Sequence, residues 1–262
     1  MATIPAGKLR IVNASVKPEN ECDVFREHAA ARIPGAKFLD LTMCKDLSSP
    51  YPFMMPDRTH FVRMMKAMGI RKSDTVVVYE TGKGWFASRA AFMLKSYGHP
   101  QVFILDGNFA KWKNEGRALE SDYGKDDAAY PNDFAYELVV DNIVPYEKVK
   151  ACAQDGSMQI VDNRPGPAFA GGSIPNSFNI PGPQLLAEDG TTKSAEQIKE
   201  IFESKGVDVN KPMIMSCTAG ILSSLGYACA VKAKLPGALF FYDGSWSEYA
   251  AMKAKETAAS QE

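Results

Sequence analysis

The chain has 262 residues, of which 45% are hydrophobic and 23% are charged, and its formal net charge is -1. This composition is typical of a globular protein, and the length suits two domains better than one core. The balanced charge excludes a general attraction to nucleic acid or to an anionic membrane, and the sequence has no apolar run of about 20 residues that could span a bilayer.

The cysteines indicate a reducing compartment. They are scattered along the chain as Cys22, Cys44, Cys152, Cys217 and Cys229, and none forms a CxxC pair. An odd, scattered set favours free thiols over a disulfide framework. The three histidines stand at no zinc-like spacing from them, so we expect no metal and no organic cofactor. The first residues lack the long apolar core of a secretory signal, so we expect a cytoplasmic protein, with the mitochondrial matrix as the alternative.

Strand-like and helix-like segments alternate along the chain. Apolar, mostly β-branched runs predict buried strands, and segments bounded by Gly, Pro-Gly or an N-cap serine predict helices. In chain order they are a helix at 61–68, a strand at 75–79, a helix at 85–96, strands at 102–105 and 158–161, a helix at 194–204, a strand at 213–215, a helix at 223–234 and a strand at 238–242. Such alternation predicts an α/β fold with mostly parallel sheets flanked by helices. The polar tail, 254–262, is expected to be disordered.

An internal repeat divides the chain. The strings LDG at 105–107 and YDG at 242–244 each close an apolar strand and stand 137 residues apart. The same offset aligns the strand at 213–215 with the strand at 75–79, and it aligns Cys217 with Glu80. A repeat of strand, loop, helix, strand and turn predicts two similar units. We expect domains at 1–122 and 136–262, joined by a polar linker at 123–135.

Cys217 is the candidate functional residue. It ends an apolar strand, and a short loop and a helix follow it. In an open α/β sheet, ligands bind beyond the carboxyl ends of the strands. The N–H groups of such a loop and the N-terminus of the next helix stabilise an anion, so more of the nucleophilic thiolate is present near neutral pH. Cys229, in contrast, stands in the middle of an apolar helix and is expected to be structural.

A cysteine in this position has two well-known uses. A cysteine phosphatase needs an arginine six residues after its cysteine, because a guanidinium grips phosphate with two hydrogen bonds. Here the sixth residue is Ser223, and the loop has neither Lys nor Arg. Phosphatase chemistry is therefore disfavoured. Sulfur transfer tolerates a neutral loop, because it depends on a thiolate and aligned N–H groups.

The chain resembles the tandem-domain rhodanese family of thiosulfate and 3-mercaptopyruvate sulfurtransferases. The resemblance extends over nearly the whole chain. It rests on 32–40, 49–56, 77–80 and 97–107 in the first half, and on 161–164, 180–181, 217–221 and the YDGSWSE string at 242–248 in the second. It implies two rhodanese-like domains, each a mostly parallel sheet flanked by helices. The first would be non-catalytic, with Glu80 at the cysteine position, and the second catalytic.

The resemblance also implies a reaction. Cys217 would take a sulfane sulfur from thiosulfate or 3-mercaptopyruvate as a persulfide and pass it to a thiophilic acceptor such as cyanide or a thiol. A thioredoxin-like reductant is a candidate protein partner, and neither nucleic acid nor membrane is implied. Arg164 would bind the anionic end of the donor, with a surface salt bridge as the alternative. The remaining predicted substrate contacts are Thr218, Ala219, Gly220, Ile221 and Leu222.

This chain departs from the family pattern at several positions. Thr218 and Ala219 match neither the Gly-Ser typical of mercaptopyruvate enzymes nor the Arg-Lys typical of thiosulfate enzymes, and Leu222 replaces the usual Thr. The segment 171–175 lacks the family's second arginine and the histidine before Ile-Pro. Asp40 and Asp46 are the nearby carboxylates that could assist catalysis instead. The alternative function is a catalytically weakened rhodanese-like binding or regulatory module.

Overall fold

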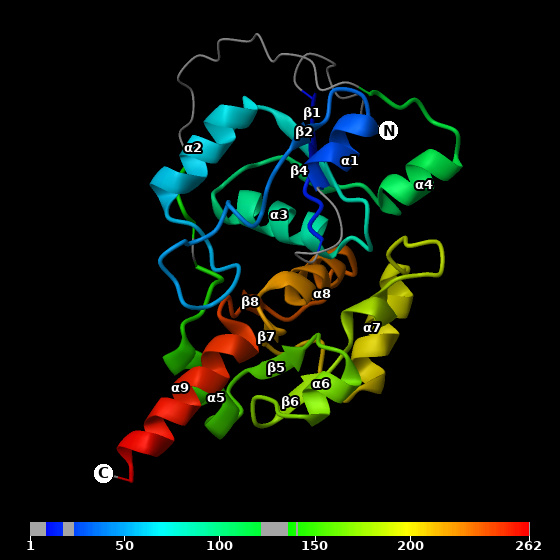
Figure 1. The fold of residues 1–262 in the computed structure, drawn as a ribbon. Coiled ribbons are helices and arrows are strands. Elements are labelled where there is room, and N and C mark those ends of the chain that lie inside the picture. Colours follow the sequence, from blue (N-terminus) through cyan, green and yellow to red (C-terminus); the bar gives the residue numbers. More distant parts are fainter. Residues whose placement is uncertain (1–8, 18–23, 122–135, 140, 262) are drawn as a thin grey trace. The chain divides into compact units, whose positions relative to one another are not determined.

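The structure is a computed structural model that describes residues 9–17, 24–121, 136–139 and 141–261 (Figure 1). These residues divide into two compact units. The first comprises the described residues up to 47, those in 55–139, and 189–191, and the second comprises 48–54, 140–188 and 192–262. The expected linker, 123–135, lies outside the described residues, so the exact domain boundaries stay a prediction.

The first unit is built on a four-stranded parallel sheet in the order β2-β1-β3-β4. Its strands are β1 (Leu9–Asn13), β2 (Lys37–Phe38), β3 (Thr75–Tyr79) and β4 (Val102–Ile104). Its helices are α1 (Val24–Ala30), α2 (Arg58–Met68), α3 (Trp85–Ser96) and α4 (Asn108–Asn114). The predicted strand at 75–79 and helix at 85–96 are confirmed to the residue. Sequence reasoning missed β1 and β2, since β2 is very short and most of β1 is only half-buried.

The second unit repeats this sheet in the order β6-β5-β7-β8, again all parallel. Its strands are β5 (Gln159–Asp162), β6 (Ser177–Asn179), β7 (Met213–Ser216) and β8 (Leu239–Phe241). Its helices are α5 (Tyr146–Asp155), α6 (Gly166–Ala170), α7 (Ala195–Ser204), α8 (Ile221–Lys232) and α9 (Ser245–Ala259), with a 3-10 turn at Gly182–Leu185. The expected α/β class, with parallel sheets flanked by helices, is confirmed.

The sequence repeat is also a repeat of backbone contacts. In the first unit, Leu105 N donates to the carbonyl of Val78 at 2.8 Å. In the second, Tyr242 N donates to the carbonyl of Met215 at 3.0 Å. Both members of each pair are 137 residues from their counterparts, so strands β3 and β7 are equivalent. The residue that follows each of these strands therefore occupies the same point of the fold.

Strand β7, one of the two inner strands of the second sheet, is buried on both faces. All four residues of β7 are buried, because helices cover both faces of a parallel sheet. Ile160 and Ile214, from neighbouring strands, pack in one core cluster with Tyr242 and Tyr249. Complete burial of a side chain of this size contributes about 1.5–3 kcal/mol.

Helix α2 begins at Arg58, three residues before the predicted start, because Asp57 caps it. Two further sequence predictions need correction. Helix α8 begins at Ile221, not at residue 223, because Gly220 adopts the left-handed conformation (φ 78°) at the N-cap and the helical turn starts directly after it. The polar tail is helical as far as Ala259, so the expectation of disorder was wrong there. Glu256 anchors this end of α9, since its Oε1 accepts from Tyr146 Oη at 2.9 Å and from Lys150 Nζ at 2.6 Å.

Candidate active site

Cys217 follows the last residue of β7 at the carboxyl edge of the second sheet. Residues 218–220 are all that separate it from α8. Gly220 makes this tight turn possible, because its φ of 78° is readily adopted only without a Cβ. The cysteine is buried, with 2% of its surface exposed. Its neighbours in the turn differ, since Thr218 is exposed whereas Ala219 and Gly220 are buried.

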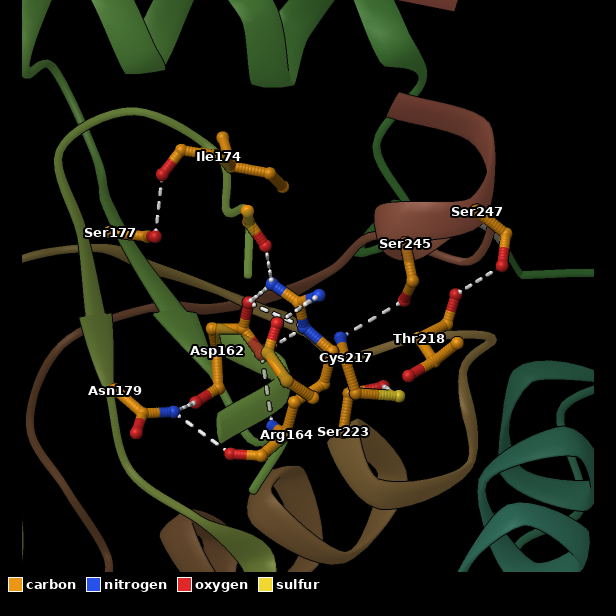
Figure 2. A network of polar contacts seen from close by, with 12 residues as sticks. Asp162, Arg164, Ile174, Ser177, Asn179, Cys217, Thr218, Ser223, Ser245 and Ser247 are labelled. Carbon is orange, nitrogen blue, oxygen red and sulfur yellow. Dashed lines mark hydrogen bonds and ion pairs between the residues drawn. The ribbon is translucent and has the colours of Figure 1, made fainter. Parts of the chain in front are cut away.

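A hydroxyl group contacts the sulfur of this cysteine. Ser223, in the first turn of α8, donates from Oγ to Cys217 Sγ at 3.4 Å. The serine is completely buried. Figure 2 shows the two side chains next to each other, to the right of the contacts between Asp162 and Arg164. In the sequence, Ser223 is informative only as the residue that stands where a phosphatase has its arginine, so its contact with the sulfur was not predicted.

The start of α9 holds the backbone of the Cys217 turn. Cys217 N donates to Ser245 Oγ at 3.1 Å, and Trp246 N donates to the carbonyl of Cys217 at 2.9 Å. The Thr218 carbonyl accepts from Ser247 N at 3.0 Å and from Ser247 Oγ at 2.8 Å (Figure 2). These bonds come from the SWS part of the YDGSWSE string. This string is one of the segments that carry the family resemblance, and in the structure its backbone and hydroxyl groups fix the turn that carries the cysteine.

The first unit shows what the equivalent turn does with an anionic group. Glu80 follows β3 at the point that matches Cys217, and it is 2% exposed. Its carboxylate accepts from the backbone N–H groups of Gly84 at 2.6 Å, Phe86 at 2.7 Å and Ala87 at 3.0 Å. Burial raises the pKa of the Glu80 carboxyl, and these N–H groups oppose the rise. A strand-turn-helix junction of this fold can thus satisfy an acidic side chain with its backbone alone.

Arg164 lies beyond the end of β5, the strand beside β7, and forms a buried ion pair. Its Nε donates to both Asp162 oxygens at 3.0 and 2.9 Å, and its Nη2 donates to Asp162 Oδ2 at 2.6 Å. Asp162 itself pairs with Ser216 across the sheet. The two side chains are 3% and 1% exposed. The pair therefore sits at the same carboxyl edge as Cys217.

The other N–H groups of Arg164 hold the following segment. Its Nη2 also donates to the carbonyl of Gly172 at 2.8 Å, and its Nη1 donates to the carbonyl of Ala168 at 3.3 Å. Trp246 covers the guanidinium, with its ring centroid 4.9 Å from Cζ. These bonds occupy four of the five N–H groups that an arginine has. The salt bridge that was the alternative reading of Arg164 is present, but it is buried and not at the surface. Donor binding by Arg164 stays a prediction, and one N–H group of the guanidinium remains for it.

The other predicted residues are placed as follows. Ile221 and Leu222 are half-buried and belong to the first turn of α8, directly beside the cysteine turn. Asp40 lies in the first unit, where its Oδ1 accepts from Thr42 N at 2.8 Å and from Thr42 Oγ1 at 2.6 Å. Asp46 lies in the first unit as well. A part for either carboxylate in the reaction stays a prediction.

No group of three or more His, Cys, Asp or Glu side chains in the part of the chain that the structure describes could hold a metal ion. No described helix is both long enough and apolar enough to cross a membrane.

Comparison with known proteins then decides the family. The model of the rhodanese-like domain matches residues 9–115 and, separately, residues 146–252. The chain belongs to the rhodanese-like family. Both units of this rhodanese-like protein are matched, which confirms the tandem arrangement expected from the repeat.

Relatives of both sulfurtransferase types are similar to this chain. Thiosulfate sulfurtransferase of Gallus gallus is 34% identical over 258 residues, which cover 92% of this chain and 86% of that protein. The 3-mercaptopyruvate sulfurtransferase of Mus musculus is 33% identical over 258 residues, with 92% and 84% covered. The crystal structure of the 3-mercaptopyruvate sulfotransferase SseA from Escherichia coli superimposes with a TM-score of 0.84 at 28% identity, covering 91% of this chain and 93% of that one.

Proposed function

We propose that this protein is a sulfurtransferase that carries a sulfane sulfur as a persulfide on Cys217. The observation that carries the proposal is the position of this thiol at the carboxyl end of the buried strand β7, with a buried hydroxyl donating to its sulfur. Similarity to sulfurtransferases along most of the chain supports the same reaction class.

The turn around Cys217 is suited to hold a negatively charged sulfur. Gly84 and Gly220 are the left-handed N-caps of α3 and α8, so they correspond to one another, and the turn that leads to Gly220 (218–220) is one residue shorter than the turn that leads to Gly84 (81–84). The N–H groups that hold the Glu80 carboxylate therefore correspond to those of Gly220, Leu222 and Ser223. We infer that these three N–H groups face the sulfur of the thiolate or persulfide, together with the positive end of α8.

In the first step, the Cys217 thiolate attacks the outer sulfur of the donor. A bond forms between Sγ and that sulfur, and the bond from that sulfur to the rest of the donor breaks. The leaving group departs with the electron pair, as sulfite from thiosulfate or as the enolate of pyruvate from 3-mercaptopyruvate, and the enolate then takes up a proton. The product on the protein is a Cys217 persulfide.

In the second step, the acceptor attacks the outer sulfur of the persulfide. Cyanide or a thiolate forms a new bond to that sulfur, the S–S bond to Cys217 breaks, and the electron pair returns to Sγ as the thiolate. No net oxidation occurs, because one sulfane sulfur has moved between two nucleophiles. A thioredoxin-like dithiol is an acceptor of suitable chemistry, because one thiolate can take the sulfur from Cys217 as a persulfide of its own. Its second thiolate can then attack the inner sulfur of that persulfide, so that the dithiol is oxidised to a disulfide and the outer sulfur leaves, reduced, as hydrogen sulfide.

Two further groups are assigned to donor binding in this proposal. The exposed side chain of Thr218 stands at the start of the turn, where it can contact a donor that approaches Cys217. Arg164 keeps the segment up to Gly172 in place and offers its remaining Nη1 hydrogen to an anionic end. The loop itself has no Lys or Arg, so we propose that both thiosulfate and 3-mercaptopyruvate be tested as donors.

The mass of the intact protein tests the proposal. Incubation with a donor should add about 32 Da, the mass of one sulfur, to the wild type and nothing to Cys217→Ser. Cys229→Ser is the matched control, since Cys229 is an equally buried thiol in α8 and should keep the mass gain. No gain with either donor, in folded and reduced protein, would exclude the sulfurtransferase and favour a binding module.

A further inference from the structure

We propose that Ser223 is a catalytic residue that donates a hydrogen bond to the anionic sulfur of Cys217. The proposal deepens the sulfurtransferase function and rests on it for the meaning of the reaction. In the family pattern the hydroxyl of this turn belongs to a threonine at the position of Leu222, which has none. The hydroxyl that reaches the sulfur here comes from the next residue along the chain.

The direction of the Ser223 hydroxyl is unusual for a helix. A serine within a helix commonly donates back to the carbonyl four residues earlier. Its neighbour Ser224 does so, with Oγ 2.7 Å from the carbonyl of Gly220, and Ser88 in α3 does the same toward Gly84 at 2.7 Å. Ser223 instead donates to Sγ at 3.4 Å, a distance suited to a sulfur acceptor. In the described part of the chain, the Cys217 sulfur is the atom that accepts the hydrogen bond from the Ser223 hydroxyl.

The equivalent position in the first unit has no hydroxyl group. Gly84 corresponds to Gly220, so Ala87 corresponds to Ser223. Ala87 contributes only its backbone N–H, which the Glu80 carboxylate accepts at 3.0 Å. A hydroxyl is thus present where the turn holds a cysteine, and a methyl group is present where the turn holds a carboxylate. The carboxylate already spreads its charge over two oxygens that accept several N–H groups, whereas the thiolate has a single sulfur atom.

The chemical effect follows from burial and charge. Cys217 is 2% exposed and Ser223 is completely buried, so little water can solvate the sulfur on that side. A hydrogen bond to the charged form of a group favours that form. The Ser223 hydroxyl keeps its proton throughout and stabilises the thiolate as nucleophile in the first step and as leaving group in the second. The half-buried Leu222 lies near Gly182 instead, with its Cδ2 3.0 Å from where a Cβ would stand there.

The test is the reactivity of Cys217 in Ser223→Ala. We would measure the rate of alkylation by iodoacetamide between pH 5 and pH 10, from the mass of the peptide that contains Cys217. Loss of the hydrogen bond should move the midpoint of the rate-against-pH curve upward by about one pH unit and, at a pH below both midpoints, slow alkylation about tenfold. The kcat of sulfur transfer should fall by about the same factor. Ser224→Ala is the matched control and should keep the wild-type midpoint.

Each outcome decides the proposal. An unchanged midpoint in Ser223→Ala would overturn it, and so would an equal shift in Ser224→Ala, because that would show a general loosening of α8. Alanine is compatible with the fold at this point, since Ala87 occupies the matching place. Alkylation requires no sulfur donor, so the test separates the two ideas. If the wild type forms no persulfide, the proposed function fails, whereas the midpoint shift still reports on Ser223.

Discussion

Glu80 and Cys217 occupy the same point of two equivalent sheets, 137 residues apart. The carbonyl of Glu80 accepts from Phe109 N at 3.1 Å, and the carbonyl of Cys217 accepts from Trp246 N at 2.9 Å. The side chain of Glu80 already fills its own turn with a carboxylate. The first unit therefore has no free N–H groups at Gly84, Phe86 and Ala87 for an external anion, and this explains physically why only the second unit is a candidate for sulfur chemistry.

Glu80 should therefore be important for stability rather than for the reaction. Glu80→Ala leaves three buried N–H groups without their acceptor, so we expect the free energy of unfolding to fall by about 3 kcal/mol. Urea denaturation measures this, and Glu115→Ala, a change at an exposed glutamate in the same unit, is the control. Sulfur transfer by the protein that remains folded should be unchanged. A variant as stable as the wild type would contradict the role assigned to the carboxylate.

The Asp162–Arg164 pair should contribute to stability beyond any part in donor binding. Asp162→Asn leaves a buried guanidinium without its counter-charge, so we expect a loss of about 3–5 kcal/mol in the free energy of unfolding. Lys199→Ala breaks an exposed pair with Glu203 on α7 and should cost about 0.5 kcal/mol or less. Chemical denaturation compares the two. A stability loss as small as that of Lys199→Ala would show that the pair is dispensable and would leave Arg164 as a pure ligand for the donor.

The side chain of Ser245 should position Cys217 by holding the backbone N–H group of the cysteine. Its Oγ accepts from Cys217 N and donates to the carbonyl of Tyr242, so Ser245→Ala removes two buried bonds at once. We expect a stability loss of about 1–3 kcal/mol and slower persulfide formation. The control is Ser260→Ala, which removes an exposed hydroxyl at the other end of α9. If stopped-flow kinetics with a sulfur donor gave the wild-type rate, the turn would not depend on this anchor.

His28 should make the first unit sensitive to mild acid. Burial lowers the pKa of His28 from 6.5 to about 4, and its Nδ1 lies 3.1 Å from Asn13 Nδ2. At a pH between these two values, the unfolded chain binds more protons at this histidine than the folded chain does. The contribution of neutral His28 to the free energy of unfolding is therefore fully present above pH 6.5 and is lost as the pH falls toward 4. The loss is about 3 kcal/mol at most.

Thermal denaturation of the wild type and of His28→Gln across this pH range is the measurement. The variant should lose part of the pH dependence and keep the rest, because burial also lowers the pKa of His99. Identical pH curves for the two proteins would exclude His28 as the source.

The parts of the fold that could be predicted from sequence are those set by local pattern. Strand β3 is a run of four β-branched residues and a tyrosine in which only Val77 is not fully buried, and α3 is bounded by Gly84 and by Tyr97-Gly98, so both were found at their correct bounds. Strands β2 and β6 are too short, and too evenly half-buried, to show an alternation of apolar and polar residues. The helical tail was missed because its composition is polar and its anchors, Tyr146 and Lys150, lie far away in the sequence.

The amino-acid order by itself determined the repeat, the α/β class and the choice of Cys217, because each depends on residue type and spacing along one strand, loop and helix. Only the tertiary structure decided which atoms meet there. The Ser223 hydroxyl donates to a sulfur whereas the Ser224 hydroxyl donates to a carbonyl, and Arg164 is held by Asp162. The partners are close in sequence, but these contacts depend on side-chain directions, which packing fixes. Such directions follow from the shape of the surrounding core, which no local pattern records.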